Sequence, residues 1–254
     1  WRRTVELIFD ITITCNSNNE YYIAEMDKSH DADLHNRLLT IMGVNSLLKD
    51  SKNLRDKILF EPVPSGDKFL APIIEALRDE YAIQITHQGF GKTYPSTYLV
   101  EPYCLKMFKQ RWYMLAYSPG TDDMRVYGLD RIQAIEPSTE KYKIPKDFDA
   151  ERYFKNTYGV SFADDQPEEV KVKISAYQAN FLRSLPIHAS QEEIECNDEF
   201  SIFRYFVVPT FEFMQELRKY GSELEVLSPQ SLRDEFIDDA GSLYSKYYGE
   251  EEQA

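Results

Sequence analysis

The spacing of hydrophobic and polar positions changes along the chain, and each change marks a different kind of element. Residues 31–60 carry Leu and Ile at intervals of three and four, with an interruption at Gly43. This spacing predicts short helices in a connecting segment. The PVPSG run at 62–66 is a turn cluster, and Asp67 after it is a candidate N-cap for a further helix.

Beyond residue 81 the period falls from about 3.6 to 2, which is typical of half-buried β-strands. The separators GFGKTYP, Lys109-Gln110 and SPGTDD fit strand connections. An open sheet of such short strands leaves unpaired edges, so we expect closure into a small β-barrel. The predicted strands are 82–88, 96–108, 111–117, 124–129 and 131–135.

The last third of the chain alternates element types in a defined order. EEVKVKISA predicts a strand, YQANFLRSL a helix, and the segments around Asp198-Glu199 a strand pair. TFEFMQELRKYG, with Thr210 as N-cap, predicts a second helix, and SELEVLS one more strand. This βαββαβ order is that of ferredoxin-like domains. Ser228-Pro229 then begins a final helix, and the predicted fold class is α+β.

At the N-terminus, WRRTVELIFDI reads as the end of a helix, and ITITCNSNNEYYIA reads as a hairpin turning at Asn-Ser-Asn-Asn. A winged helix-turn-helix ends in this way, but many other folds also contain a helix followed by a hairpin. The resulting division is 1–26 (helix and hairpin), 27–80 (helical connector), 81–140 (barrel) and 141–254 (ferredoxin-like domain with a terminal helix).

Charge narrows the choice of ligand site. The chain of 254 residues has a net charge of -14. Residues 189–254 hold 5 Lys/Arg and 16 Asp/Glu, so this part will not bind a phosphate backbone. Residues 101–131 hold 5 basic and 4 acidic side chains, and the cations are clustered. An anion should therefore bind there if it binds anywhere.

Several function classes find no support in the sequence. No apolar run approaches the roughly 18–20 residues of a membrane helix, and no signal peptide is evident, so we expect a cytoplasmic protein without membrane contact. Cys15, Cys104 and Cys196 are far apart and are expected to be reduced thiols. His30 and His35 lack metal-ligand geometry. Phosphate-loop, dinucleotide and nucleophile motifs are absent, and we expect no catalytic residues, metal or cofactor.

The stretch RWYMLAY at 111–117 combines an arginine with phenols. Strand alternation places Arg111 and Tyr113 on one face, opposite an apolar face that should fill the barrel. On the following strand, Arg125 and Tyr127 share a face. If both apolar faces point inward, these four side chains and Tyr117, which shares the face of Arg111, form one surface suited to a planar anion, with Arg131 at its rim. The alternative is a solvated sheet face on which Arg lies over Tyr.

The run VEPYCLKMFKQRWYMLAY followed by MRVYGLDRI resembles the WYL domain of bacterial transcriptional regulators. Its signature reads Trp112-Tyr113-Met114 here, with Met in place of Leu, a swap that keeps an apolar volume. The N-terminal helix and hairpin resemble the tail of the family's winged helix-turn-helix, and the C-terminal domain resembles the extension that often follows WYL. Phrases such as ILFEPVPSG and SLPIHASQ are similar to regulators common in the Bacteroides group.

The resemblance implies a small Sm/SH3-like barrel that senses nucleic acid or a nucleotide, in a regulator that works as a homodimer. By motif position the ligand site would contain Tyr113, Arg125 and Arg131, with Arg111 and Tyr127 added by face parity and Lys106 as a further member. Most of the family's DNA-binding domain is missing, so Arg2 and Arg3 would be the tail of an operator-contacting helix. Two alternatives stay open: a protein-interaction module without a ligand, and a sensor of a small metabolite.

Overall fold

The computed structural model describes residues 12–15, 21–25, 64–161 and 166–248. Contacts divide the chain into two units, 1–62 and 63–254. In the first unit β1 (Thr12–Cys15) pairs antiparallel with β2 (Tyr21–Glu25), which confirms the predicted hairpin. The predicted helix before this hairpin and the connector at 31–60 lie outside the described residues.

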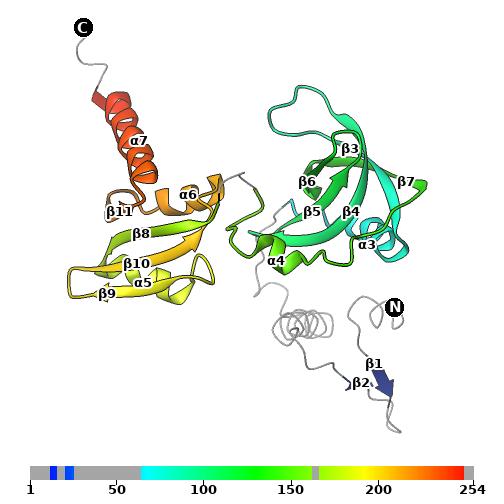
Figure 1. Cartoon of the computed structure of the whole chain (residues 1–254), viewed down its shortest axis with the longest axis horizontal. Helices are drawn as coiled ribbons and strands as arrows, with labels where there is room; N and C mark the ends of the chain where they lie inside the picture. Colours follow the sequence, from blue (N-terminus) through cyan, green and yellow to red (C-terminus); the bar gives the residue numbers. More distant parts are fainter. Residues whose placement is uncertain (1–11, 16–20, 26–63, 162–165, 249–254) are drawn as a thin grey trace, which may run out of the picture. The chain divides into compact units, whose positions relative to one another are not determined.

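The predicted barrel segment forms one antiparallel five-stranded sheet in the order β6-β5-β4-β3-β7 (Figure 1). The long strand β4 pairs with both β3 and β5, and its register shifts between Pro102 and Cys104. Closure into a barrel is not confirmed, because within 64–161 no ladder joins β6 to β7. The strands are β3 (Tyr81–His87), β4 (Ser96–Phe108), β5 (Arg111–Ser118), β6 (Asp123–Gly128) and β7 (Ile132–Lys141).

A turn and a helix precede this sheet. The prediction that Asp67 is a helix N-cap is wrong, because Asp67 is the first residue of the 3-10 helix η2 (Asp67–Phe69). The Ser65 hydroxyl donates a hydrogen bond to the Asp67 carboxylate. Helix α3 (Leu70–Asp79) follows and buries Ile73 in the core of the sheet. Gly66 has a φ of 76°, and a Cβ there would lie 2.4 Å from the carbonyl carbon of Leu129. Only glycine therefore allows this turn to pack on η3 (Leu129–Arg131).

The C-terminal domain confirms the predicted βαββαβ order. Its sheet runs β11-β8-β10-β9, the strand order of a ferredoxin-like fold, and its core includes residues of α5 and α6. No helix in the described part of the chain is long and apolar enough to cross a membrane. The elements are α4 (Ala150–Phe154), β8 (Glu168–Ser175), α5 (Ala176–Ser184), β9 (Glu192–Cys196), β10 (Phe200–Val207), α6 (Phe211–Arg218), η4 (Gly221–Glu223), β11 (Leu224–Ser228) and α7 (Gln230–Tyr248).

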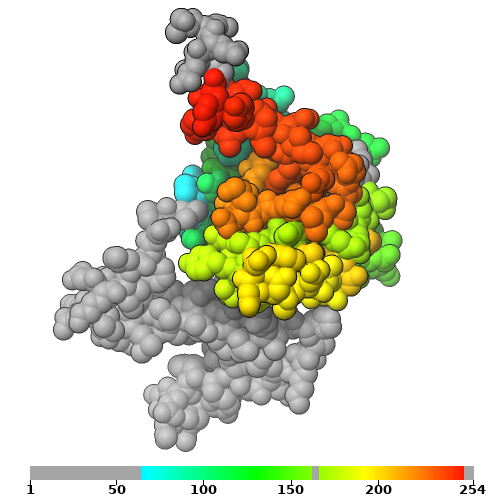
Figure 2. Space-filling view, turned by 90° about the vertical axis from the view of Figure 1, so that its left-hand side faces the viewer, coloured from blue at the N-terminus to red at the C-terminus, as the bar shows by residue number. Residues whose placement is uncertain are grey.

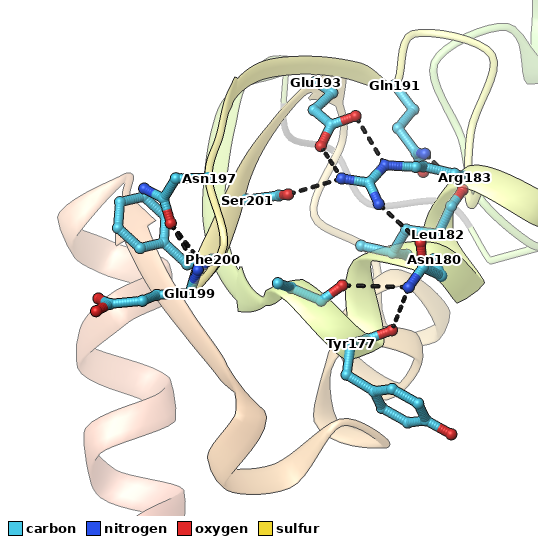
Figure 3. A network of polar contacts seen from close by, with 11 residues as sticks. Tyr177, Asn180, Leu182, Arg183, Gln191, Glu193, Asn197, Glu199, Phe200 and Ser201 are labelled. Atoms are coloured by element: carbon cyan, nitrogen blue, oxygen red, sulfur yellow. Dashed lines mark hydrogen bonds and ion pairs between the residues drawn. The ribbon is translucent and has the colours of Figure 1, made fainter.

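Arg183 in this domain uses most of its N–H donors in hydrogen bonds. Arg183 donates from Nε and Nη2 to the Glu193 carboxylate, at 3.0 and 2.5 Å, and from Nη2 to the Ser201 hydroxyl at 3.0 Å (Figure 3). Its Nη1 donates to Asn180 at 2.8 Å. This network joins α5 to β9 and β10, so Arg183 is a structural residue.

The carboxylate of Glu216 on α6 is buried, with 8% of the residue exposed. Lys109, in the β4–β5 turn, donates to it at 2.7 Å, and Lys219 donates to its other oxygen. Burial opposes ionisation, but the hydrogen bonds from Lys109, Lys219 and Tyr158 outweigh it and lower the pKa of Glu216 to about 2. Ionised Glu216 therefore stabilises the fold at neutral pH.

We expect Glu216→Gln to lower the free energy of unfolding by about 1–2 kcal/mol at pH 7, since both lysines are partly exposed and lose a charged acceptor. In the wild type this contribution is fully present above the unfolded pKa near 4.5 and is lost as pH falls toward 2. Urea unfolding between pH 7 and 3 measures both effects. Glu223→Gln, at an exposed position of η4, is the matched control. Equal stability of the two variants at pH 7 would contradict the prediction.

Candidate ligand site

Two arginines share one carboxylate where β6 ends. Asp130 lies in η3, and its side chain is 9% exposed. Arg111, the first residue of β5, places Nη1 3.5 Å from Asp130 Oδ2, and Arg131 places Nε 3.8 Å from Asp130 Oδ1. We call Arg111, Asp130 and Arg131 the arginine–aspartate cluster. One negative charge faces two positive charges, so the cluster has a net positive charge.

Glycine at position 128 makes room for the cluster. Gly128 ends β6, and a Cβ there would lie 2.6 Å from Arg131 Nη2 and 2.6 Å from Asp130 Oδ1. Its partner across the ladder is Tyr113 of the Trp-Tyr-Met signature. The phenol and the cluster are therefore neighbours on this part of the sheet. Burial, and next the Asp130 carboxylate, raise the pKa of Tyr113, so the phenol stays protonated at neutral pH.

Lys106 is the ladder partner of Tyr113 on β4. Its ammonium donates to the carbonyl of Gly159 at 2.6 Å and lies 3.9 Å from the centre of the Phe154 ring. Burial lowers the pKa of Lys106. The ammonium is thus already bound by residues that follow the sheet, and it has less capacity for a ligand than the guanidinium groups.

Two members of the cluster and a histidine near it carry polar atoms without a partner. Among the described residues, His87 Nε2, Asp130 Oδ1 and Arg131 Nε are buried and make no hydrogen bond. Burial, followed by the charge of Arg131, lowers the pKa of His87, so its ring is neutral at pH 7. Buried polar atoms are normally paired, and unpaired ones need an explanation such as a missing ligand or water.

A pocket of about 360 Å³ opens beside Arg131. Phe90 and Lys92, in the β3–β4 connection, line it together with Asp130 and Arg131. The sequence reading treated GFGKTYPS only as a strand connector and missed these two residues. The available signal was an aromatic between two glycines, followed by a lysine. A larger groove of about 1270 Å³ lies along α7 and contains none of the predicted ligand residues.

The structure corrects the predicted common surface. Arg125 pairs with Ala116, and Tyr127 pairs with Met114, so both lie on the opposite sheet face from Arg111 and Tyr113. Tyr127 is only 4% exposed and belongs to the core of the sheet. The prediction assumed one apolar face per strand, but Met114, Leu115 and Ala116 are all buried. Alternation along β5 therefore does not identify a single inner face.

The acidic side chains beside Arg125 and Arg131 leave most N–H donors of these two guanidinium groups unused. Arg125 Nε is 3.9 Å from Asp123 Oδ2, and Arg131 has only the 3.8 Å approach to Asp130. Arg131 donates no side-chain hydrogen bond within the described residues, in contrast to Arg183, which makes four. Arg2 and Arg3, the predicted DNA contacts, lie outside the described residues.

Two protein families match parts of this chain. Residues 68–137, which hold most of the five-stranded sheet and the whole arginine–aspartate cluster, match the WYL domain. The chain therefore contains a WYL domain. Residues 166–244 match the WCX domain, so the ferredoxin-like domain is the WCX domain that follows WYL.

Solved structures give two further likenesses. One is proteasome accessory factor B/C (PafBC) of Arthrobacter aurescens, at 19% identity and a TM-score of 0.32, over 69% of this chain and 26% of that one. The other is a CRISPR Cas-related protein, at 13% identity and a TM-score of 0.44, over 70% of this chain and 51% of that one. The chain thus spans about a quarter and about half of these two proteins. No curated protein matches it.

In the WYL domain we expect Gly128→Ala to displace the arginine–aspartate cluster, because the new methyl group would overlap Arg131 and Asp130. The ends of both side chains can move, so the protein should fold and lose about 1 kcal/mol of unfolding free energy. A crystal structure should show Asp130 and Arg131 moved from their places over residue 128. Gly120→Ala is the control, since nothing lies within 4 Å of its Cβ position. An unchanged cluster in Gly128→Ala would contradict this expectation.

Proposed function

We propose that this chain is the ligand-sensing and dimerisation part of a bacterial transcriptional regulator. Its WYL domain binds an anionic ligand, an oligonucleotide or a nucleotide, at the arginine–aspartate cluster. The observation that carries the proposal is that Arg111 and Arg131 share a single carboxylate beside an open pocket. The excess guanidinium charge is available to phosphate oxygens, which guanidinium groups bind bidentately.

Two further features favour a nucleotide-like anion over a simple one. The pocket holds the ring of Phe90, and the Tyr113 phenol lies next to the cluster. Aromatic rings offer stacking faces to planar bases, whereas inorganic phosphate uses only the cations. A small acidic metabolite with a ring would meet the same requirements, so free nucleotides and aromatic acids belong among the ligands tested.

The response to the ligand would be a change in DNA binding. The segment that holds Arg2 and Arg3 would belong to the operator-binding domain, in a cytoplasmic regulator without enzymatic activity. The ligand can shift the DNA-binding equilibrium only if it binds one arrangement of the dimer more tightly than the other. Such a mechanism requires no cofactor.

A protein-interaction module without a ligand is the second candidate. It would be favoured if neighbouring acids engaged the arginines fully. Asp123 and Asp130 do lie within 4 Å of Arg125 and Arg131, but the distances of 3.9 and 3.8 Å exceed those of hydrogen-bonded ion pairs. The contrast with Arg183 and Glu193 at 2.5 Å supports the ligand-binding proposal.

We expect Arg131→Ala and Arg111→Ala to weaken binding of a fluorescent single-stranded DNA roughly 10-fold or more, because each loses a charge-assisted contact. Fluorescence anisotropy over a series of salt concentrations measures the dissociation constants and the number of phosphate contacts. Arg125→Ala is the matched control, since Arg125 lies on the other sheet face. Equal binding by all four proteins, or no binding by any, would remove the nucleic-acid proposal.

The homodimer in this proposal is supported by α7. Figure 2 shows this helix, orange to red, at the surface. Leu232 is its only buried residue among the described ones, whereas Leu243 and Tyr247 are 56% and 77% exposed. Ala240, Leu243 and Tyr247 recur at intervals of three and four, as in helix–helix seams.

Charge supports a second copy of α7 as the partner of this seam. The first half of the helix carries Asp234, Glu235, Asp238 and Asp239, of which Glu235 and Asp239 pair with Arg218, and its last turn carries Lys246. In an antiparallel pair, each Lys246 would face the acidic half of the other helix. We therefore assign dimerisation to α7.

Leu243→Glu should convert the dimer to a monomer. Each copy would lose about 1.5–3 kcal/mol of stabilisation from apolar burial. Because a two-fold dimer contains the substitution in both copies, the loss occurs twice, and the dimer dissociation constant should rise roughly 100-fold or more. Analytical ultracentrifugation measures this change. Ser245→Glu, two positions away and outside the groove, is the control. A wild type that is monomeric, or a Leu243→Glu variant that remains dimeric, would contradict the assignment.

A further inference from the structure

The connection between β3 and β4 presents two aromatic rings to solvent. Phe90 is 82% exposed and Tyr94 is 78% exposed. A single exposed apolar side chain needs no explanation. Phe90, however, stands over the guanidinium of Arg131, with 4.6 Å between the guanidinium carbon and the ring centre. The ring therefore belongs to the wall of the pocket beside the arginine–aspartate cluster.

Hydrogen bonds hold this connection against the sheet. The Gln88 side-chain amide donates to the carbonyls of Lys92 and Thr93, both at 3.2 Å, and its oxygen accepts from Gln133 Nε2 at 3.0 Å. The backbone N–H of Gln88 donates to the Arg131 carbonyl at 3.1 Å. These hydrogen bonds hold the β3–β4 connection next to Arg131, over which Phe90 lies. A ring held in place before binding loses little conformational entropy when a ligand stacks on it.

The polar atoms near the Phe90 ring suit a ligand that is charged and also has hydrogen-bonding groups. Arg131 Nε and Asp130 Oδ1 are buried without a hydrogen bond among the described residues, although they are only 3.8 Å apart. One is a donor and the other an acceptor. Lys92 adds a second cation to the pocket lining. The volume of about 360 Å³ is near the lower end of ligand sites and suits a single nucleotide unit.

We propose that Phe90 is a stacking platform for one unpaired nucleobase, and that Lys92 and Arg131 bind the phosphate attached to that nucleotide. This inference rests on the proposed function and makes it more specific, because it requires the WYL domain to recognise a base as well as an anion. Stacking accepts any base, since every base has a π-face. The site should therefore prefer single strands, whose bases are free to stack, to duplexes.

The test separates the base from the phosphates. Fluorescence anisotropy with the full chain compares a short labelled oligo-dT with an abasic oligonucleotide of the same length and charge. We expect the wild type to bind oligo-dT at least 5-fold more tightly than the abasic strand. Phe90→Leu should remove this preference and leave binding of the abasic strand unchanged. Phe90→Tyr should restore it, and Phe211→Leu, at a 63% exposed position of α6, should have no effect.

The outcomes distinguish this inference from the function on which it rests. If Phe90→Leu binds oligo-dT as tightly as the wild type does, while Arg131→Ala binds it weakly, the stacking inference is wrong and the anionic site remains. If the wild type binds oligo-dT and the abasic strand with equal affinity, the stacking inference is likewise wrong and the anionic site remains. If the wild type binds neither strand, the proposed nucleic-acid function is wrong, and the stacking inference fails with it. Loss of abasic binding in Phe90→Leu would show structural damage to the cation site and would also count against stacking.

Discussion

The site depends on Asp130, a carboxylate with little exposure held between two guanidinium groups. An ionised side chain removed from water is stable only when it is paired, and Arg111 and Arg131 provide that pairing. The sharing also explains why the arginines remain available. A carboxylate 3.5–3.8 Å from each orients both guanidinium groups without using all of their donors. Asp130 thus positions the cations that a ligand would meet, and it reduces the repulsion between them.

Strand pairing brings Arg111, Asp130 and Arg131 together. Arg111 opens β5, and Asp130 and Arg131 lie in η3 directly after β6, which pairs with β5. Two glycines allow the close packing: Gly66 permits the preceding turn to approach Leu129, and Gly128 leaves space for the side chains of residues 130 and 131. A side chain at either position would push the cluster away from the sheet.

Periodicity in the sequence predicted the strands and the βαββαβ order well, because alternation and turn residues are local properties of the chain. The predictions that needed the pairing between strands were less reliable. The loop at 118–123 does not fix the register, and both faces of β5 are buried, so parity placed Arg125 and Tyr127 on the wrong side. Phe90 was missed for a related reason: its position over Arg131 depends on how β3 and β7 pair, which no residue of the loop encodes.

Charge limits which anions this protein can accept. With a net charge of -14 and most of the excess acid in the C-terminal quarter, the chain repels a long polyanion. At physiological ionic strength, interactions between exposed charges are screened beyond about 8 Å, so a cation cluster can attract a ligand only over a short range. A short single strand or a nucleotide can lie within that range of Arg111 and Arg131, whereas a long duplex would extend past it. The charge distribution therefore favours a small anion over a long polyanion as the ligand of the proposed site.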